Sequence, residues 1–183
     1  MIVFAQALYL ISPAVVAGIV HGAVIKRDVA PLLARPLDGG RLWNGRPLLG
    51  PNKTWRGLVV MSGVSTVVVL VQGAGDGVGF FDRLAVVDYG GRWWWTLGIA
   101  LGLGYSLAEL PNSFVKRRLG IRSGQATGRL QYVVDQADSV VGATLALALF
   151  VRSPSVLAAV AAAGVALHVV IDELLYVFGV KHR

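Results

Sequence analysis

The chain has 183 residues, of which 55% are apolar and only 15% are charged, and its mean hydropathy is +0.65. This composition excludes an ordinary water-soluble domain and favours an integral membrane protein, while the absence of cysteine excludes disulfides and thiolate metal sites. The formal net charge of +7 comes without a zinc-finger spacing or an RNA-binding aromatic motif, so anionic lipid or phosphate is a better candidate partner than nucleic acid.

Apolar stretches that could cross a bilayer recur along the chain. A helix needs about 20 mostly apolar residues to span a hydrocarbon core of about 30 Å. The sequence therefore predicts an all-α fold, a polytopic integral membrane protein with about five transmembrane helices, in a single domain of residues 1–183. The first stretch has no basic region before it, which favours an uncleaved helix over a signal peptide. The predicted spans are Ile2 to Ile25, Arg56 to Val71, Trp93 to Leu110, Tyr132 to Val151 and Val156 to Val180.

Lysine and arginine are distributed unevenly between the two sides that these spans define. Of the 17 basic residues, only Arg83, Arg92 and Arg152 fall on the side of the second loop. Because cytoplasmic loops are enriched in lysine and arginine, we expect the N-terminus outside and the C-terminus inside the cell membrane. The first and third loops, with their polar motifs, then face the cytoplasm.

The first of these loops ends in GPNKTWRG, in which Asn52, Lys53 and Thr54 lead directly into the second span. The N-terminus of a helix presents unpaired N–H groups and a partial positive charge that suit a phosphate. Lys53 and Arg56 would add full charges, although the spacing is not that of a Walker A motif. The alternative is a turn that is basic only because it is cytoplasmic.

Carboxylates gather around the third loop. Asp135 and Asp138 are three residues apart, so a helix places both on one face. Glu109, Asn112 and Ser113 have helical spacing as well, provided that the third helix continues past a proline at position 111. Three carboxylates beside the Lys-Arg-Arg run of residues 116–118 could hold Mg²⁺ through oxygen ligands while the cations hold phosphates.

The alternative for this cluster is a purely structural set of salt bridges between two helices. In that case Asp135 and Asp138 would pair with Arg117 or Arg118 and would serve only to join two helices.

The three motifs GPNKTWRG, SFVKRRLGI and VVDQADSVVGA occur in an order and spacing that resemble the CDP-archaeol synthase family, membrane cytidylyltransferases related to the CDP-diacylglycerol synthases. The resemblance covers about Pro36 to Ala143, and the ELPNSF form of the second motif resembles a bacterial branch. It implies that CTP and a lipid phosphate, a glycerol phosphate diether or diester, react with Mg²⁺ to give CDP-lipid and pyrophosphate in phospholipid biosynthesis.

Residue roles follow from this resemblance together with the chemistry of the side chains. The predicted catalytic residues are Lys53, Lys116, Asp135 and Asp138. The predicted ligands of Mg²⁺ are Asp135, Asp138 and Glu109. The predicted substrate-binding residues are Asn52, Thr54, Arg56, Asn112, Ser113, Arg117 and Arg118.

Two other classes of protein were weighed against this function. A CDP-alcohol phosphotransferase would require a DG pair followed by an AR pair and spaced aspartates, a pattern that is absent here. A non-enzymatic membrane scaffold or small transporter would explain the hydrophobicity, but it gives no reason for carboxylates and cations on one face.

The remaining polar residues receive structural interpretations. His168 and Asp172 are four residues apart in the last span and can share a face, which favours a hydrogen bond between packed helices over catalysis. His21 is a lone histidine near the end of the first span and is expected to be structural. The glycine-rich stretch of residues 73–80 lies in the outer loop and is expected to be a connector.

Overall fold

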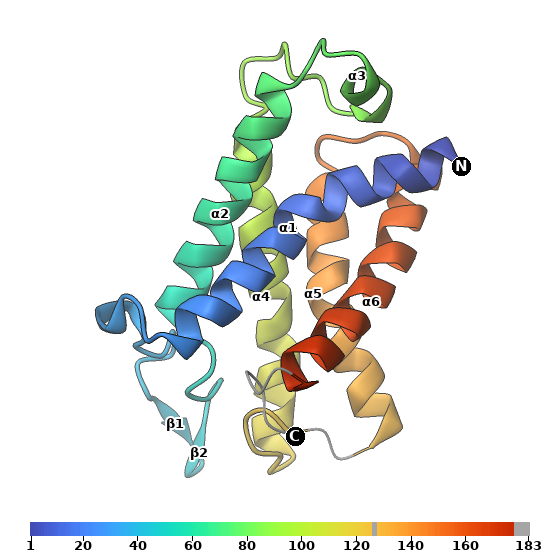
Figure 1. The fold of residues 1–183 in the computed structure, drawn as a ribbon. Coiled ribbons are helices and arrows are strands. Elements are labelled where there is room, and N and C mark those ends of the chain that lie inside the picture. The colour runs from blue at the N-terminus through green and yellow to red at the C-terminus, as the bar shows by residue number, and fades with distance from the viewer. Residues whose placement is uncertain (126–127, 178–183) are drawn as a thin grey trace.

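Long helices make up most of the structure, a computed structural model that describes residues 1–125 and 128–177 (Figure 1). Each long helix overlaps one predicted span, and the end predicted at Val180 lies outside the described residues. The long helices are α1 (Ile2–Lys26), α2 (Trp55–Ala74), α4 (Thr96–Arg118), α5 (Arg129–Leu147) and α6 (Pro154–Val177).

Three of these helices are long and apolar enough to cross a membrane, judged over the described residues: α1, α2 and the Pro154–Ile171 part of α6. The two others, α4 and α5, carry the charged motifs at one end. The mostly helical architecture agrees with the all-α prediction and with an integral membrane protein.

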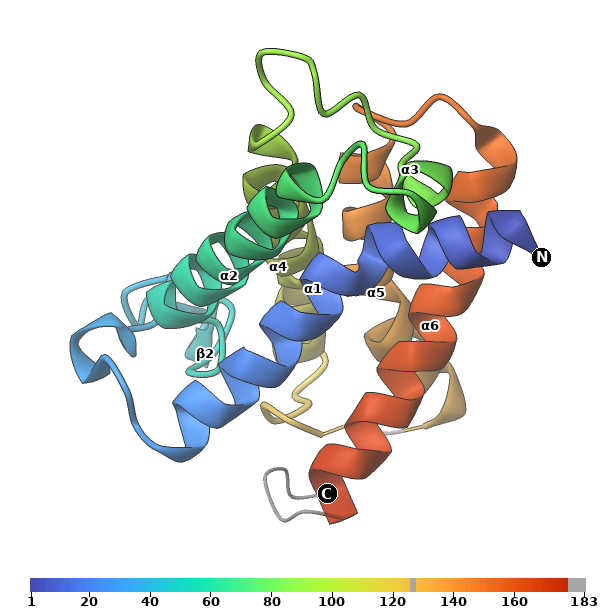
Figure 2. The ribbon, with the colours of Figure 1, turned by 45° about the horizontal axis from the view of Figure 1, so that its top comes forward.

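The helices pack with α1 lying at a slant across the others, from the N-terminus beside α6 to the base of α2 (Figures 1 and 2). Behind it, α4 contacts both α2 and α5. The buried core between them is aliphatic, with Leu10, Val69, Leu97, Leu101 and Leu147 among its fully buried members.

Glycines allow α4 to approach its neighbours closely. A Cβ atom at Gly98 or Gly102 would collide with the backbone of α2, and one at Gly104 would lie 2.6 Å from the carbonyl oxygen of Gly142 on α5. Small residues at such contacts let membrane helices pack backbone against backbone. The close packing of α4 on α5 brings the polar ends of both helices together.

The predicted loops contain short elements of their own. The first loop holds a 3₁₀ turn (Pro31–Leu33) and a hairpin of β1 (Leu42–Trp43) and β2 (Arg46–Pro47). Asn44 and Gly45 connect the two strands with φ of 51° and 73°, as a type I′ turn requires. The glycine-rich stretch of residues 73–80 connects the end of α2 to a short helix, α3 (Phe80–Leu84).

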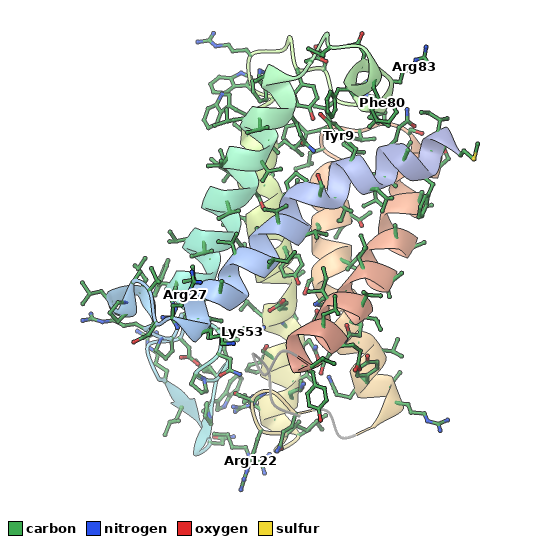
Figure 3. The ribbon with its side chains drawn as sticks, viewed as in Figure 1. Tyr9, Arg27, Lys53, Phe80, Arg83 and Arg122 are labelled. Carbon is green, nitrogen blue, oxygen red and sulfur yellow. The ribbon has the colours of Figure 1, made fainter. Side chains whose placement is uncertain are left out.

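The two ends of the bundle carry different side chains (Figure 3). Arg27, Lys53 and Arg122 lie toward the end with the hairpin, whereas Phe80 and Arg83 lie at the opposite end. This arrangement matches the predicted separation of the basic loops from the outer loop.

Candidate active site

The α4 side of the site is one face of a helix that runs through a proline. Glu109, Asn112 and Lys116 follow one another at intervals of one turn, so their side chains point to the same side. The helix continues without interruption past Pro111 to Arg118, as the predicted spacing required.

Asn112 joins the two aspartates of α5. Its side-chain nitrogen donates to Oδ1 of Asp135 at 2.8 Å and to Oδ2 of Asp138 at 2.7 Å. Gln131, one turn before Asp135, donates to the amide oxygen of Asn112 at 2.9 Å and to Oδ1 of Asp135 at 3.0 Å. The two aspartates therefore share one face, as predicted, and that face meets α4.

Glu109, Asp135 and Asp138 form an acidic cluster, and two lysines neutralise part of its charge. Nζ of Lys116 lies 2.7 Å from Oδ2 of Asp135, and the lysine side chain is only 8% exposed. Lys53, which arrives from the loop before α2, pairs with Oε2 of Glu109. The other oxygen of Glu109 accepts a hydrogen bond from the hydroxyl of Ser139 at 2.6 Å. Residues from three separate segments thus converge on one polar cluster.

Asp138 differs from the other two carboxylates because it has no cation beside it within the described residues. Its Oδ1 accepts from the backbone N–H of Ser139 at 2.6 Å and lies 3.1 Å from the hydroxyl of the same residue. Neutral donors stabilise a carboxylate less than a full positive charge does, so Asp138 is the carboxylate of the three with the least neutralised charge.

Asp38 holds the loop that carries Lys53 in place. Its carboxylate accepts hydrogen bonds from the backbone N–H groups of Gly40 at 2.9 Å, Leu49 at 2.8 Å and Gly50 at 3.3 Å. Partial burial of the carboxylate raises its pKa, but these three donors outweigh that effect, and the pKa of Asp38 is lowered from its ordinary value. The N–H of Leu37 also donates to the carbonyl oxygen of Lys53 at 2.7 Å, which ties the two ends of the loop together.

The arginines at the end of α4 organise loops. Arg117 is buried and donates to the hydroxyl of Ser123 at 3.0 Å. Arg118 lies over the ring of Trp43, 5.8 Å from its centroid, and donates to the carbonyl oxygens of Trp43 at 2.7 Å and Arg46 at 3.1 Å. Arg118 therefore fastens the hairpin to the end of α4.

The alternative of an Asp–Arg salt-bridge set is wrong in its choice of cation. Asp135 pairs with Lys116, while the hydrogen bonds of Arg117 and Arg118 go to the third loop and to the hairpin. The reason is angular: Lys116 follows Asn112 by one turn and so faces α5, whereas the next two residues rotate away from that face.

Of the other predicted substrate-binding residues, Asn52, Thr54 and Arg56 lie around the start of α2. The Thr54 hydroxyl caps this helix by accepting from the backbone N–H three residues later at 3.2 Å. Arg56 is buried and pairs with Asp28 at 2.8 Å, which anchors the end of α1 rather than the acidic cluster. Asn52 is exposed on the loop, and Ser113 is buried on α4.

The donor atoms of the cluster suit Mg²⁺. The described residues contain no group of three or more His, Cys, Asp or Glu side chains arranged to hold a metal ion. Asp135 and Asp138 nevertheless each direct one oxygen at the side-chain nitrogen of Asn112, so two carboxylate oxygens converge on one point. The oxygens of Glu109 face Lys53 and Ser139 instead, so its role as a metal ligand stays a prediction.

Sequence reasoning missed two residues of the cluster, Gln131 and Ser139. Gln131 stands four residues before Asp135, and Ser139 directly follows Asp138, so helical spacing could have identified the first. His21 packs against Gly57 at the start of α2, consistent with the structural role expected of it.

An apolar groove opens beside the cluster between α4 and α5. It has a volume of about 840 Å³, and Asn112 and Asp138 of the cluster line it. The apolar side chains along it include Val115, Leu130, Val134 and Val141, all of them exposed. Polar and apolar surfaces therefore meet within one opening, as an amphiphilic ligand requires.

Fold and site together define a helical membrane enzyme with a charged centre at one end of its bundle. The family described as CarS-like, CDP-archaeol synthase, matches residues 1–183, and the chain belongs to this family. It is accordingly a CTP-dependent nucleotidyltransferase of the CDP-archaeol synthase type, as the three motifs predicted.

Curated relatives and one solved structure are similar over most of the chain. A CDP-archaeol synthase of Halorubrum lacusprofundi is 37% identical over 156 residues, which cover 81% of this chain and 83% of that protein. One from Halobacterium salinarum is 36% identical over 163 residues, which cover 80% and 81%. A structure described as an intramembrane enzyme for archaeal membrane lipids biosynthesis has a TM-score of 0.61 and 28% identity, and covers 91% of this chain and 92% of its own.

Proposed function

We propose that this protein transfers the cytidylyl group of CTP to a membrane lipid phosphate, a glycerol phosphate diether or diester, in a Mg²⁺-dependent reaction. An oxygen of the lipid phosphate forms a bond to the α-phosphorus of CTP, and the bond from that phosphorus to the bridging oxygen breaks, which releases pyrophosphate. The attacking phosphate is already ionised at neutral pH, so the reaction requires no general base.

The observation that carries the proposal is that Glu109 and Asp135 each pair with a lysine, whereas Asp138 has no cation beside it among the residues that the structure describes. Asp135 and Asp138 would hold Mg²⁺, with Asn112 and Glu109 as candidate further ligands. The bound ion would supply charge neutralisation on the phosphate oxygens.

The lysines have the complementary task of attracting and stabilising anions. Lys116 is buried beside Asp135 and would stabilise charge that develops on the phosphates during transfer. Lys53 sits on a loop at the cluster and would turn from Glu109 toward a phosphate of CTP. Thr54, at the N-terminus of α2, and the exposed Asn52 adjoin Lys53 in the chain and would contribute to the same phosphate site.

The groove between α4 and α5 would admit the lipid. Its exposed valine and leucine side chains would lie against the hydrocarbon tails, while Asn112 and Asp138 in its lining would receive the phosphate. This places the two anionic substrates on either side of the acidic cluster.

The proposed topology is a single membrane-embedded domain with five spans in the cell membrane. The N-terminus would lie outside, and the acidic cluster would face the cytoplasm, where CTP is available. The concentration of basic residues at the hairpin end of the bundle supports this orientation (Figure 3).

The direct test uses purified protein in detergent with labelled CTP, Mg²⁺ and a panel of dialkyl and diacyl glycerol phosphates. We expect CDP-lipid and pyrophosphate to form in equal amounts, and chelation of Mg²⁺ to stop both. The proposal fails if no lipid phosphate supports release of pyrophosphate from CTP.

A further inference from the structure

His168 on α6 is hydrogen-bonded to both helices that carry the acidic cluster. Its Nε2 lies 3.2 Å from the hydroxyl oxygen of Tyr105 on α4, and its Nδ1 lies 3.0 Å from the backbone carbonyl oxygen of Gln136 on α5. The rings of His168 and Tyr105 also meet edge to face, with 6.0 Å between centroids. The side chain of Asp172, predicted to share its face, lies outside the described part of the structure.

The carbonyl of Gln136 fixes a proton on one ring nitrogen of His168. A carbonyl oxygen can only accept, so Nδ1 of His168 carries the proton that bonds to Gln136. In the neutral imidazole Nε2 is then an acceptor, and the hydroxyl of Tyr105 donates to it. Both ring nitrogens are engaged, and the ring orientation is fixed by a different helix on each side.

These contacts lie within one turn of the acidic residues. Gln136 is 5% exposed and stands between Asp135 and Asp138, and Tyr105 precedes Glu109 by four residues on α4. A small cavity of about 40 Å³ adjoins the histidine ring. Apart from Tyr105 and His168 its lining residues are apolar, so no other side chain of that lining can replace the hydrogen bond to α5.

We infer that His168 is a positioning residue: it holds the segment of α5 that bears Asp135 and Asp138 in register with α4. In that register Asn112 can reach both aspartates at once. The inference rests on the proposed function, because the register matters for a metal ion shared by the two carboxylates. Residues that orient the ligands of a metal ion without binding the ion themselves typically change metal affinity or activity by about 10–100-fold when they are removed.

The test compares His168→Leu, which removes both hydrogen bonds, with His168→Asn, whose amide nitrogen can replace Nδ1 as the donor to Gln136. Binding of Mn²⁺, a spectroscopic substitute for Mg²⁺, is followed by the electron paramagnetic resonance of the free ion with lipid absent. Because CTP itself binds Mn²⁺, a protein-free solution with the same CTP and Mn²⁺ gives the baseline from which binding to the protein is counted. We expect His168→Leu to weaken Mn²⁺ binding about tenfold and to lower kcat by a similar factor, and His168→Asn to restore most of both.

Val160→Ala is the matched control on the same helix. Val160 is fully buried in the core and makes no contact with the cluster through a hydrogen bond, so its truncation should lower the Tm and leave the Kd for Mn²⁺ unchanged. Tyr105→Phe removes only the hydroxyl bond and should fall between the wild type and His168→Leu.

The outcomes separate this inference from the proposed function. Wild-type Mn²⁺ binding by His168→Leu would overturn the positioning role, as would an equal loss in His168→Leu, His168→Asn and Val160→Ala. Wild-type protein that binds Mn²⁺ without forming CDP-lipid would overturn the proposed function alone. Wild-type protein that binds no Mn²⁺ with CTP present would overturn both.

Discussion

Lys116 and Asp135 form an ion pair across the interface of α4 and α5, with 2.7 Å between Nζ and Oδ2. Asp138, one turn further along α5, receives only neutral donors within the described residues. The two aspartates look equivalent in the sequence, yet their different surroundings predict different effects on stability and on activity when each is replaced.

Replacement of each aspartate by asparagine should distinguish an effect on turnover from an effect on stability. Asp138→Asn removes a carboxylate without a paired cation, so turnover should fall at least about a hundredfold, or about 2.7 kcal/mol, with little change in Tm. Asp135→Asn leaves the buried Lys116 without its partner, so it should lose about 1–3 kcal/mol of stability as well as activity. Turnover and Tm in detergent are the measurements, and Asp76→Asn in the outer loop is the control. Full activity of Asp138→Asn would remove this residue from the mechanism.

The lysine of the first loop should affect the use of CTP. Lys53→Met removes a charged donor at the cluster but leaves both aspartates in place, so the KM for CTP should rise about tenfold or more. Lys26→Met, at the exposed end of α1, should leave this KM unchanged. Steady-state kinetics at saturating lipid decide the matter, and an unaltered KM in Lys53→Met would exclude the proposed phosphate contact.

Acid should loosen the loop that carries Lys53, through Asp38. The pKa of Asp38 is lower in the folded protein, so its carboxylate adds stability above its unfolded pKa of about 3.9 and loses it as pH falls through the folded pKa. Asp38→Asn should therefore have a lower Tm than the wild type at pH 7, and this difference should disappear at acidic pH. Thermal unfolding from pH 7 down to about pH 2 tests this prediction, since the difference should shrink below the unfolded pKa, and a constant difference over the whole range would contradict it.

The groove between α4 and α5 should limit the use of lipid rather than of CTP. A tryptophan at Val134 would fill part of the groove, so Val134→Trp should raise the KM for the lipid phosphate several-fold and leave the KM for CTP unchanged. Val133→Trp is the matched control, because Val133 is the exposed neighbour that does not line the groove. Equal effects of the two substitutions would argue against lipid binding there.

The orientation in the membrane can be tested with single cysteines, since the natural chain has none. Val78, near α3, and Leu32, in the 3₁₀ turn, are 59% and 78% exposed and should tolerate Val78→Cys and Leu32→Cys. In cells whose outer wall has been removed but whose cell membrane is intact, a membrane-impermeant maleimide should label the cysteine at position 78. It should label the cysteine at position 32 only after lysis. Labelling of both before lysis would refute the proposed topology.

The sequence by itself determined the properties that depend on neighbours along the chain. Apolar length marked the helices that the structure contains, and the interval between Asp135 and Asp138 placed both on one face. The three ordered motifs indicated the family. The Asn44–Gly45 pair also carried a hairpin signal, which local turn chemistry would have revealed.

Only the tertiary structure decided which side chains meet. The helical period places Lys116, and not Arg117, on the face of Asn112, and the packing of α4 on α5, which are close at Gly104 and Gly142, turns that face toward Asp135. The partners of His168 likewise depend on how α6 lies against α4 and α5. Helical period sets directions around one axis, whereas contacts between axes depend on packing over the whole bundle, which no short stretch of sequence encodes.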